Sequence, residues 1–296
     1  MKKTTLLLLL FVFTSLLSAD RANLTWVQSW AYWLQDIEIE KLKNNSSDLI
    51  VIDYSKDGLA ETAFTKDEIQ SLKDEGKVVL AYLSIGEAED YRFYWKESWN
   101  ENPPSFLGEE NPDWAGNYKV KYWEKEWWKK VIRPYLKKII SAGFDGVYLD
   151  IIDGYYYYGE QDGKMKKRAN QMVRLVEKIA KFSRRKEGQE FAIFPQNGSS
   201  ILDDASTKFK NRYLNVIDGI GVESLYYNVH SSDDQEYRKE KLAELTEHNK
   251  LILNVEYINE SKYNEYFDTW ENSELNIVGY PAHPDTALDE LITPYQ

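Results

Sequence analysis

The stretch GFDGVYLDIIDGY, residues 143–155, holds the clearest strand of the chain and an acid at the point where that strand ends. Gly143 closes an amphipathic stretch over residues 124–141, and the apolar run 146–150 follows directly. This run lacks strict polar–apolar alternation, as expected for a strand buried on both faces of a parallel sheet. We therefore take a helix, followed by a buried strand that ends on Asp150, as the repeating unit of the fold.

The same unit recurs along the whole chain. Short apolar runs, rich in Val, Ile, Leu and Tyr, alternate with longer amphipathic stretches. The eight runs are residues 27–35, 49–54, 78–84, 146–150, 191–196, 217–223, 251–257 and 277–282. Eight such repeats predict one α/β domain with a closed (β/α)8 (TIM) barrel. An open doubly wound sheet is the alternative, but no glycine-rich nucleotide loop follows the first run.

Helices are predicted between the runs from the 3.6-residue spacing of apolar side chains. The first begins at Thr65, whose side chain can form a capping box with Glu68. The predicted helices cover residues 65–75, 124–141, 164–186, 236–248 and 262–270.

Composition excludes several kinds of site and partner. The chain has no cysteine, so it has no disulfide or thiolate metal site, and its three histidines form no metal-binding motif. A net charge of -12 disfavours nucleic acid as a partner. We expect no metal and no cofactor. Aromatic residues make up 15% of the chain, which fits either a large core or rings that pack on sugars.

The first 19 residues have the organisation of a signal peptide. Lys2 and Lys3 precede an apolar run over residues 6–17, and Ser18-Ala19 supplies small residues for cleavage. An uncleaved anchor is the alternative, although the run is short for a membrane span. We expect a secreted or periplasmic protein, residues 20–296, that is a monomer and has no stable membrane insertion after signal cleavage.

Two aromatic segments follow strand ends. A long connection over residues 86–121 is rich in Tyr, Trp and Phe, and it is predicted to be a loop that forms a lid or a substrate wall. A packed surface excursion is the alternative. Four consecutive tyrosines, residues 155–158, are predicted to form a sugar subsite on a surface loop.

Acids end four of the apolar runs: Asp53, Asp150, Glu223 and Glu256. In a barrel such residues gather at one rim, where several ionised carboxylates are costly without a function. For Asp53 and Glu256 the alternative is a structural tie to Arg or Lys. Two carboxylates in different environments can hydrolyse a glycosidic bond without any cofactor.

Other polar side chains at the same rim are suited to sugar hydroxyls. Asp153 can instead cap the helix that follows it. The strand-end groups and near neighbours are Gln28, Gln35, Ser84, Glu87, Gln196, Asn197 and Tyr280.

Several segments resemble the endo-α-1,4-polygalactosaminidase family, glycoside hydrolase family 114, and its exported bacterial and archaeal relatives. The matching pieces are VIDY at 51–54, AYLSIGEAEDYR at 81–92, GFDGVYLDIIDGY at 143–155, Gln196-Asn197 and Val222-Glu223. Together they span nearly all of the chain after the signal peptide.

The resemblance implies a barrel that cleaves α-linked, galactosamine-containing polysaccharide. It implies Asp150 as nucleophile and Glu223 as general acid/base of a retaining reaction, with exchanged roles as the alternative. A hydrolase of a different α-glycan and a non-catalytic carbohydrate-binding barrel are the competing hypotheses. The residues expected to bind substrate are Asp53, Tyr54, Tyr82, Ser84, Glu87, Asp153, Tyr155, Gln196, Asn197, Glu256 and Tyr280.

Overall fold

A computed structural model describes residues 24–187 and 190–293 of the protein. The predicted signal peptide, residues 1–19, lies outside the described residues. Within the described ranges, no helix is both long enough and apolar enough to span a lipid bilayer.

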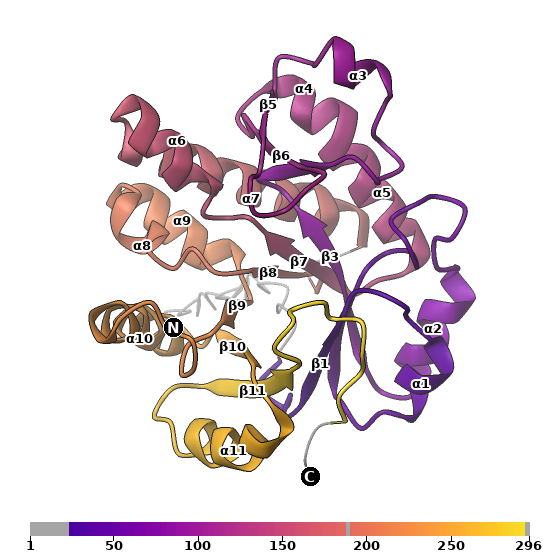
Figure 1. Ribbon diagram of the computed structural model, residues 1–296, viewed down its shortest axis with the longest axis vertical. Helices are drawn as coiled ribbons and strands as arrows, with labels where there is room; N and C mark the ends of the chain where they lie inside the picture. The colour runs from indigo at the N-terminus through magenta and orange to yellow at the C-terminus, as the bar shows by residue number, and fades with distance from the viewer. Residues whose placement is uncertain (1–23, 188–189, 294–296) are drawn as a thin grey trace, which may run out of the picture.

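Parallel strands form the central barrel, and each apolar run of the sequence contains one of them (Figure 1). Hydrogen-bonded neighbours run in the order β1-β2-β3-β7-β8 and β9-β10-β11. The (β/α)8 barrel predicted from the sequence is confirmed. Its eight strands in the described chain are β1 (Trp30–Trp33), β2 (Leu49–Ile52), β3 (Val78–Ser84), β7 (Gly146–Asp150), β8 (Ala192–Pro195), β9 (Gly219–Glu223), β10 (Leu251–Tyr257) and β11 (Ile277–Ala282).

The two groups of strands meet at both edges, and these contacts close the barrel. Between β8 and β9, Gln196 forms a parallel bridge with Gly221, and the N–H of Asn197 donates to the Gly221 carbonyl at 2.8 Å. Between β1 and β11, the rings of Trp30 and Tyr280 pack with centroids 5.6 Å apart. The strand ends therefore converge on one rim.

Helices cover the outside of the barrel, and the predicted ones are present (Figure 1). The capping box at Thr65 and Glu68 is formed in both directions. The short π-helical turn η1 joins α4 to α5, and together they occupy the helix predicted over 124–141. The outer helices are α1 (Ile39–Asn44), α2 (Lys66–Asp74), α4 (Lys125–Trp127), η1 (Trp128–Ile132), α5 (Arg133–Ala142), α7 (Met165–Glu187), α9 (Thr207–Val216), α10 (Ser232–Glu247) and, after the 3-10 turn η2 (Glu260–Lys262), α11 (Tyr263–Glu271).

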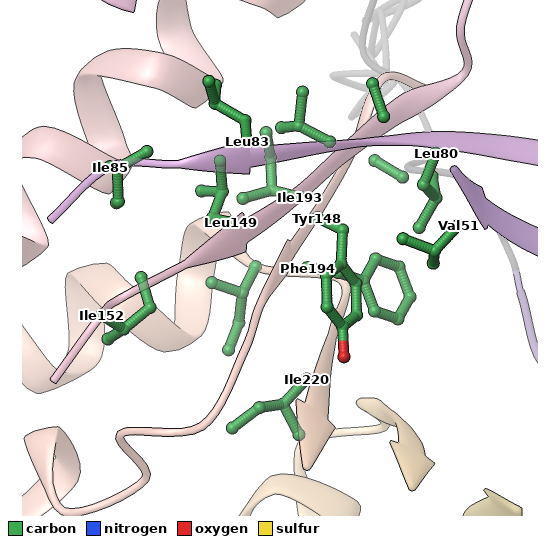
Figure 2. Close-up of a cluster of buried hydrophobic side chains, with 14 of the residues drawn as sticks. Val51, Leu80, Leu83, Ile85, Tyr148, Leu149, Ile152, Ile193, Phe194 and Ile220 are labelled. Atoms are coloured by element: carbon green, nitrogen blue, oxygen red, sulfur yellow. The ribbon is translucent and has the colours of Figure 1, made fainter. Parts of the chain in front are cut away.

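Large aromatic side chains fill the barrel interior. Tyr148 on β7 and Phe194 on β8 are paired neighbours in the sheet, and both are completely buried (Figure 2). The strand next to β8, β9, has glycines where these rings approach. A Cβ on Gly221 would lie 1.7 Å from the Tyr148 hydroxyl, and one on Gly219 would lie 2.1 Å from Phe194. The two glycines of β9, Gly219 and Gly221, are therefore required by the size of their neighbours.

The long connection after β3 contains regular structure, in contrast to the loop predicted over 86–121. A small antiparallel sheet forms in the order β4-β6-β5, from β4 (Glu87–Glu89), β5 (Leu107–Glu110) and β6 (Asn117–Val120). The short helix α3 (Ser98–Glu101) lies between β4 and β5. Packed side chains stabilise this unit, since Trp99 and Phe106 are buried with ring centroids 5.5 Å apart. The small sheet forms a wall above the barrel.

The tyrosine run 155–158 lies in a helix, so the prediction of a surface loop there was wrong. Helix α6 (Gly154–Asp162) follows β7, and the short helix α8 (Ile201–Asp204) follows β8. Helical periodicity separates the four rings, because Tyr155 and Tyr158 are buried while Tyr156 is 50% exposed. Asp153 occupies the N-cap position of α6, but its side chain makes no capping hydrogen bond.

The chain after β11 folds back across the end of β1 (Figure 1). The backbone N–H groups of Leu34 and Gln35 donate to the Leu288 carbonyl at 2.8 and 3.1 Å. The Gln35 amide donates to the Ala287 carbonyl at 2.7 Å. This segment becomes part of the rim on the side opposite to α6.

Candidate active site

Asp150 and Glu223 are the last residues of β7 and β9, and both line a cavity of about 880 Å³ at the carboxyl end of the barrel. The backbone turns sharply after each of them, because Ile151 and Ser224 have positive φ angles of 58° and 49°. A β-branched residue rarely adopts this conformation, and such strain is found most often at functional sites. The turns direct both carboxylates into the same cavity.

Two donors hold the carboxylate of Asp150. The Tyr82 hydroxyl donates to Oδ2 at 2.5 Å, and the N–H of Ile151 donates to Oδ1 at 2.7 Å. Burial raises the pKa of Asp150, and the negative charge of Glu223 raises it further, to about 8. At neutral pH Asp150 therefore holds a proton beside the side chain of Glu223.

The carboxylate of Glu223 also has two donors. The Asn197 amide donates to Oε2 at 2.7 Å, and the Tyr257 hydroxyl donates to Oε1. The N–H of Glu223 donates to Oδ1 of Asn197 at 3.0 Å, which fixes the orientation of that amide. Arg238 donates to the carbonyls of Glu223 and Ser224. The end of β9 is therefore held by side chains from β10, α10 and the turn after β8.

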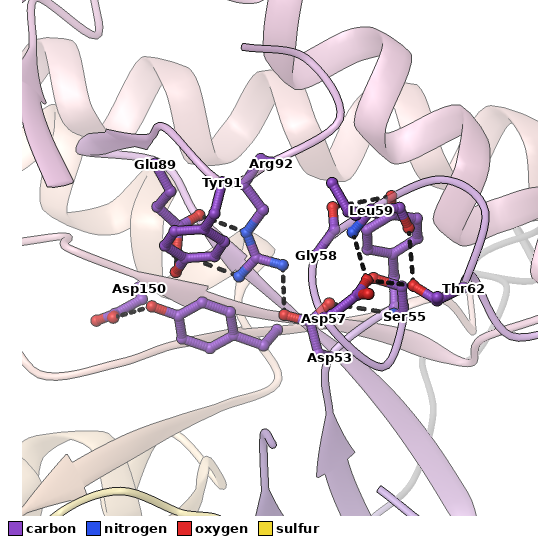
Figure 3. Close-up of polar contacts among 12 residues, drawn as sticks. Asp53, Ser55, Asp57, Gly58, Leu59, Thr62, Glu89, Tyr91, Arg92 and Asp150 are labelled. Atoms are coloured by element: carbon purple, nitrogen blue, oxygen red, sulfur yellow. Dashed lines mark hydrogen bonds and ion pairs between the residues drawn. The ribbon is translucent and has the colours of Figure 1, made fainter. Parts of the chain in front are cut away.

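Asp53 is paired with an arginine. Arg92 donates to Asp53 through Nη1 and to Glu89 through Nε at 2.8 Å and Nη2 at 3.1 Å (Figure 3). All three residues are nearly buried. The guanidinium also lies 5.9 Å from the centre of the Tyr82 ring. Asp53 therefore forms a structural ion pair with an arginine, which is the alternative given for it from the sequence. The cluster supports the floor of the cavity beside Asp150.

Glu256 is turned away from the cavity. Its Oε1 accepts from the N–H groups of Leu225 at 2.6 Å and Tyr226 at 2.8 Å, and its Oε2 accepts from Tyr227 at 3.1 Å. These bonds hold the chain that leaves β9. The next residue, Tyr257, lines the cavity instead. Successive strand residues face opposite sides, so only one of the two reaches the site.

Of the residues expected to bind substrate, several line the cavity and several lie outside it. Four of them are buried outside the cavity and form hydrogen bonds with their neighbours: Tyr54, Ser84, Tyr155 and Tyr280. Tyr54 bonds to Gly58, and Ser84 bonds to Glu87. Tyr155 bonds to Ser200 and Asp204, and Tyr280 bonds to Ile292. Those on the cavity wall are Asp53, Tyr82, Glu87, Asp153, Gln196 and Asn197.

Two further tyrosines of the cavity, Tyr32 and Tyr257, were not anticipated from the sequence. Tyr32 donates to Gln196 Oε1 at 3.1 Å on the cavity floor. Trp114, which lies between β5 and β6 in the connection predicted to form a lid or a substrate wall, lines the cavity and is 58% exposed. The parity of the strands could have indicated Tyr32 and Tyr257, since alternate residues of a barrel strand point inward. No group of three or more His, Cys, Asp or Glu side chains in the described part of the chain is placed to hold a metal ion.

Known proteins resemble this chain over most of its length. Residues 15–283 match glycoside-hydrolase family GH114. An uncharacterized protein of Methanocaldococcus jannaschii is 41% identical over 286 residues, covering 94% of this chain and 81% of that protein. An uncharacterized protein of Thermotoga maritima is 38% identical over 275 residues, covering 89% of this chain and 83% of that protein.

Two solved structures share the fold. The glycoside hydrolase domain of PelA from Pseudomonas aeruginosa has a TM-score of 0.66 at 18% identity and covers 90% of this chain and 98% of that domain. Ega3 of Aspergillus fumigatus, solved in complex with galactosamine, has a TM-score of 0.66 at 16% identity and covers 93% of this chain and 99% of that one. The chain belongs to glycoside-hydrolase family GH114, and it is a glycoside hydrolase with a carbohydrate substrate.

Proposed function

We propose that the protein is an exported hydrolase of an α-linked, galactosamine-containing polysaccharide, with Asp150 and Glu223 as its catalytic carboxylates. The observation that carries this proposal is that the two acids line one cavity and that the charge of Glu223 helps to raise the pKa of Asp150 to about 8. A pair that holds one proton has both forms that glycoside hydrolysis needs: a carboxylic acid to protonate the leaving oxygen and a carboxylate.

The proposed reaction retains the anomeric configuration. Asp150 attacks the anomeric carbon while Glu223 donates its proton to the glycosidic oxygen, so that bond breaks and a glycosyl ester forms on Asp150. Glu223, now ionised, takes a proton from water, and the resulting nucleophile replaces Asp150 at the same carbon. Both carboxyl groups return to their starting states.

The raised pKa of Asp150 favours exchanged roles in the free protein, because it places the shared proton on Asp150. An ammonium group bound closer to Asp150 than to Glu223 reverses this preference, because a positive charge stabilises the nearer carboxylate more and lowers its pKa. The proton then moves to Glu223, and Asp150 becomes available as the nucleophile. An amino sugar therefore suits the role of Asp150 that the family resemblance implies.

The charge of the cavity supports an amino-sugar substrate. Eight acidic residues and two basic residues line it, so it attracts cations. One of the two bases, Arg92, is already paired with Asp53 and Glu89. Ega3, a protein of similar fold, was solved with galactosamine. These observations favour a galactosamine polymer over a neutral α-glycan.

The deciding experiment measures release of reducing ends from a panel of purified polysaccharides that includes partly deacetylated α-1,4-linked galactosamine polymers. Wild type is compared with Asp150→Asn and Glu223→Gln, and the circular dichroism of each variant checks its fold. Release by wild type alone supports the proposal. Equal release by either folded variant contradicts the assignment of that carboxylate, and release from a neutral α-glycan alone contradicts the amino-sugar substrate.

Azide distinguishes the two roles. In a retaining enzyme, azide replaces a missing acid/base and gives a glycosyl azide of retained configuration, whereas it replaces a missing nucleophile with inversion. We expect the retained product from Glu223→Ala and the inverted product from Asp150→Ala. The opposite pair of products means that the roles are exchanged.

Export rests on the pattern of residues 1–19. The full chain, expressed in a bacterium with its own leader, is expected outside the cytoplasm with Asp20 as its first residue. N-terminal sequencing of the purified protein checks this. An intact Met1 on protein that stays in the cytoplasm contradicts export.

A further inference from the structure

A second cavity, of about 770 Å³, opens beside the one that contains Asp150 and Glu223. Its walls come from α6, the small sheet, the turn after β8, and α10, and we call it the α6 cavity. The two cavities share Glu87, Ile151 and Asp153. A smaller cavity of about 300 Å³, between β9 and α10, also includes Asp153. The rim of the barrel therefore has one continuous groove that passes Asp153.

An exposed aromatic ring lies on the wall of the α6 cavity. Tyr156 is 50% exposed, and its hydroxyl has no hydrogen-bond partner among the described residues. Its helix neighbour Tyr157 is fixed differently, because its hydroxyl contacts Glu109 and Gln161. An exposed tyrosine on a concave surface offers an apolar face to a ring and a hydroxyl to its polar edge, which is the combination that a pyranose needs.

A buried carboxylate stands where the α6 cavity meets the catalytic cavity. Glu87 is 4% exposed, and its Oε1 accepts from the Asn111 amide at 3.0 Å. Its Oε2 has no partner among the described residues. Burial raises the pKa of Glu87, against the opposing charge of Lys119. An unpaired buried carboxyl oxygen is costly, and a polar ligand group in the groove would reduce that cost.

We propose that the α6 cavity binds further sugar units of the same glycan chain that is cut at Asp150 and Glu223, with the Tyr156 ring as a stacking platform and Glu87 as a polar contact. This inference rests on the proposed function and extends it. A chain that occupies both cavities is held on one side of the cleaved bond over several units. The protein therefore cuts long chains more efficiently than short ones, and Tyr156 determines that preference.

The test compares kcat/KM for a long galactosamine polymer with kcat/KM for the shortest oligosaccharide that wild type cuts. Tyr156→Ala is expected to lower kcat/KM for the polymer by about tenfold, the size of one lost aromatic contact. Its kcat/KM for the short substrate is expected to stay within about twofold of wild type. Trp26→Ala is the matched control, because Trp26 is a similarly exposed aromatic residue, at 47%, that lines none of the three cavities.

An equal effect of Tyr156→Ala on both substrates, or no effect on either, overturns the inference and leaves the proposed function intact. Failure of the proposed function is visible separately, as a wild type that cuts no galactosamine polymer. Calorimetric binding of galactosamine oligosaccharides of increasing length then decides the inference. Affinity that rises with length in wild type but not in Tyr156→Ala supports it, whereas equal affinities, or no binding by either protein, overturn it.

Discussion

The Tyr82 hydroxyl donates a 2.5 Å hydrogen bond to Oδ2 of Asp150, across the neighbouring strands β3 and β7. The ring of Tyr82 lies 5.9 Å from the guanidinium of Arg92, which is itself paired with Asp53 and Glu89. Tyr82 therefore connects a buried ion-pair cluster to the carboxylate proposed as nucleophile. Its position makes it a positioning residue for Asp150.

Replacing Tyr82 with Phe is expected to lower kcat/KM by roughly 10- to 100-fold, the size of one lost hydrogen bond to a charged group. The Tyr82 hydrogen bond lowers the pKa of Asp150, so its loss raises that pKa. The alkaline limb of the pH profile for kcat/KM is therefore expected to move to higher pH. This shift separates positioning of Asp150 from a general loss of structure.

Tyr122→Phe is the control for Tyr82→Phe. Tyr122 is buried, its hydroxyl donates to the Arg168 carbonyl at 2.8 Å, and it lines none of the three cavities. We expect this variant to keep the wild-type pH profile while losing some thermal stability. A Tyr82→Phe profile that coincides with that of Tyr122→Phe contradicts the role of Tyr82.

Activity is expected to fall as the pH rises through about 8. The pKa of Asp150 in the free protein is raised to about 8, so below this pH the catalytic pair keeps one proton. Above it, both carboxylates are ionised and the leaving oxygen can no longer be protonated. The pH dependence of kcat/KM checks this, since it reports the free enzyme. A profile that stays flat to pH 10 contradicts a shared proton.

The (β/α)8 barrel could be predicted because buried parallel strands produce apolar runs that single-sequence patterns detect. The small sheet could not be predicted in the same way. Its strand β4 has the sequence EAE, which has no apolar pattern of its own, and it forms because Asn117–Val120 pairs with it. The pairing is a tertiary effect, so local sequence does not reveal it.

The two strand-end acids were predicted to meet, and both line the cavity, but the sequence did not distinguish inward from outward positions. Glu256 and Tyr257 are adjacent at the end of the run 251–257, and Glu256 was predicted to face the site because it is the acid. Register decides between them, because Val255 pairs with Glu223 and the strand then turns Tyr257 inward. The ion pair between Arg92 and Asp53 could not be predicted, because the two residues are 39 positions apart in the sequence.

Asp150→Asn is expected to be more stable than wild type at pH 8. The folded pKa of Asp150 is raised to about 8, whereas the unfolded value is about 3.9. Between these values the folded state binds more protons than the unfolded state, so the free energy of unfolding falls as the pH rises. Asparagine does not ionise and avoids this loss. The melting temperature of Asp150→Asn is expected to exceed that of wild type by a few degrees at pH 8 and to match it near pH 4.

Differential scanning calorimetry from pH 4 to pH 8 checks the stability of Asp150→Asn. The control is Asp74→Asn, because Asp74 is an exposed residue at the end of α2 and lies on none of the three cavities. Its difference from wild type is expected to stay small across the range. A constant difference between Asp150→Asn and wild type would show that the folded carboxyl does not titrate near pH 8.

Removing the arginine of the buried cluster is expected to lower the free energy of unfolding far more than removing a partly exposed one. Arg92→Met leaves Asp53 and Glu89 without a countercharge, and such a loss lowers the free energy of unfolding by roughly 3–5 kcal/mol. Arg212→Met breaks the ion pair between Arg212 and Glu177, and the side chains of both residues are 32% exposed. Its loss lowers the free energy of unfolding by at most about 1 kcal/mol. Urea denaturation measures both. Equal losses would mean that water reaches the Asp53–Arg92–Glu89 cluster, so that Arg92 could not hold the floor beneath Tyr82 and Asp150.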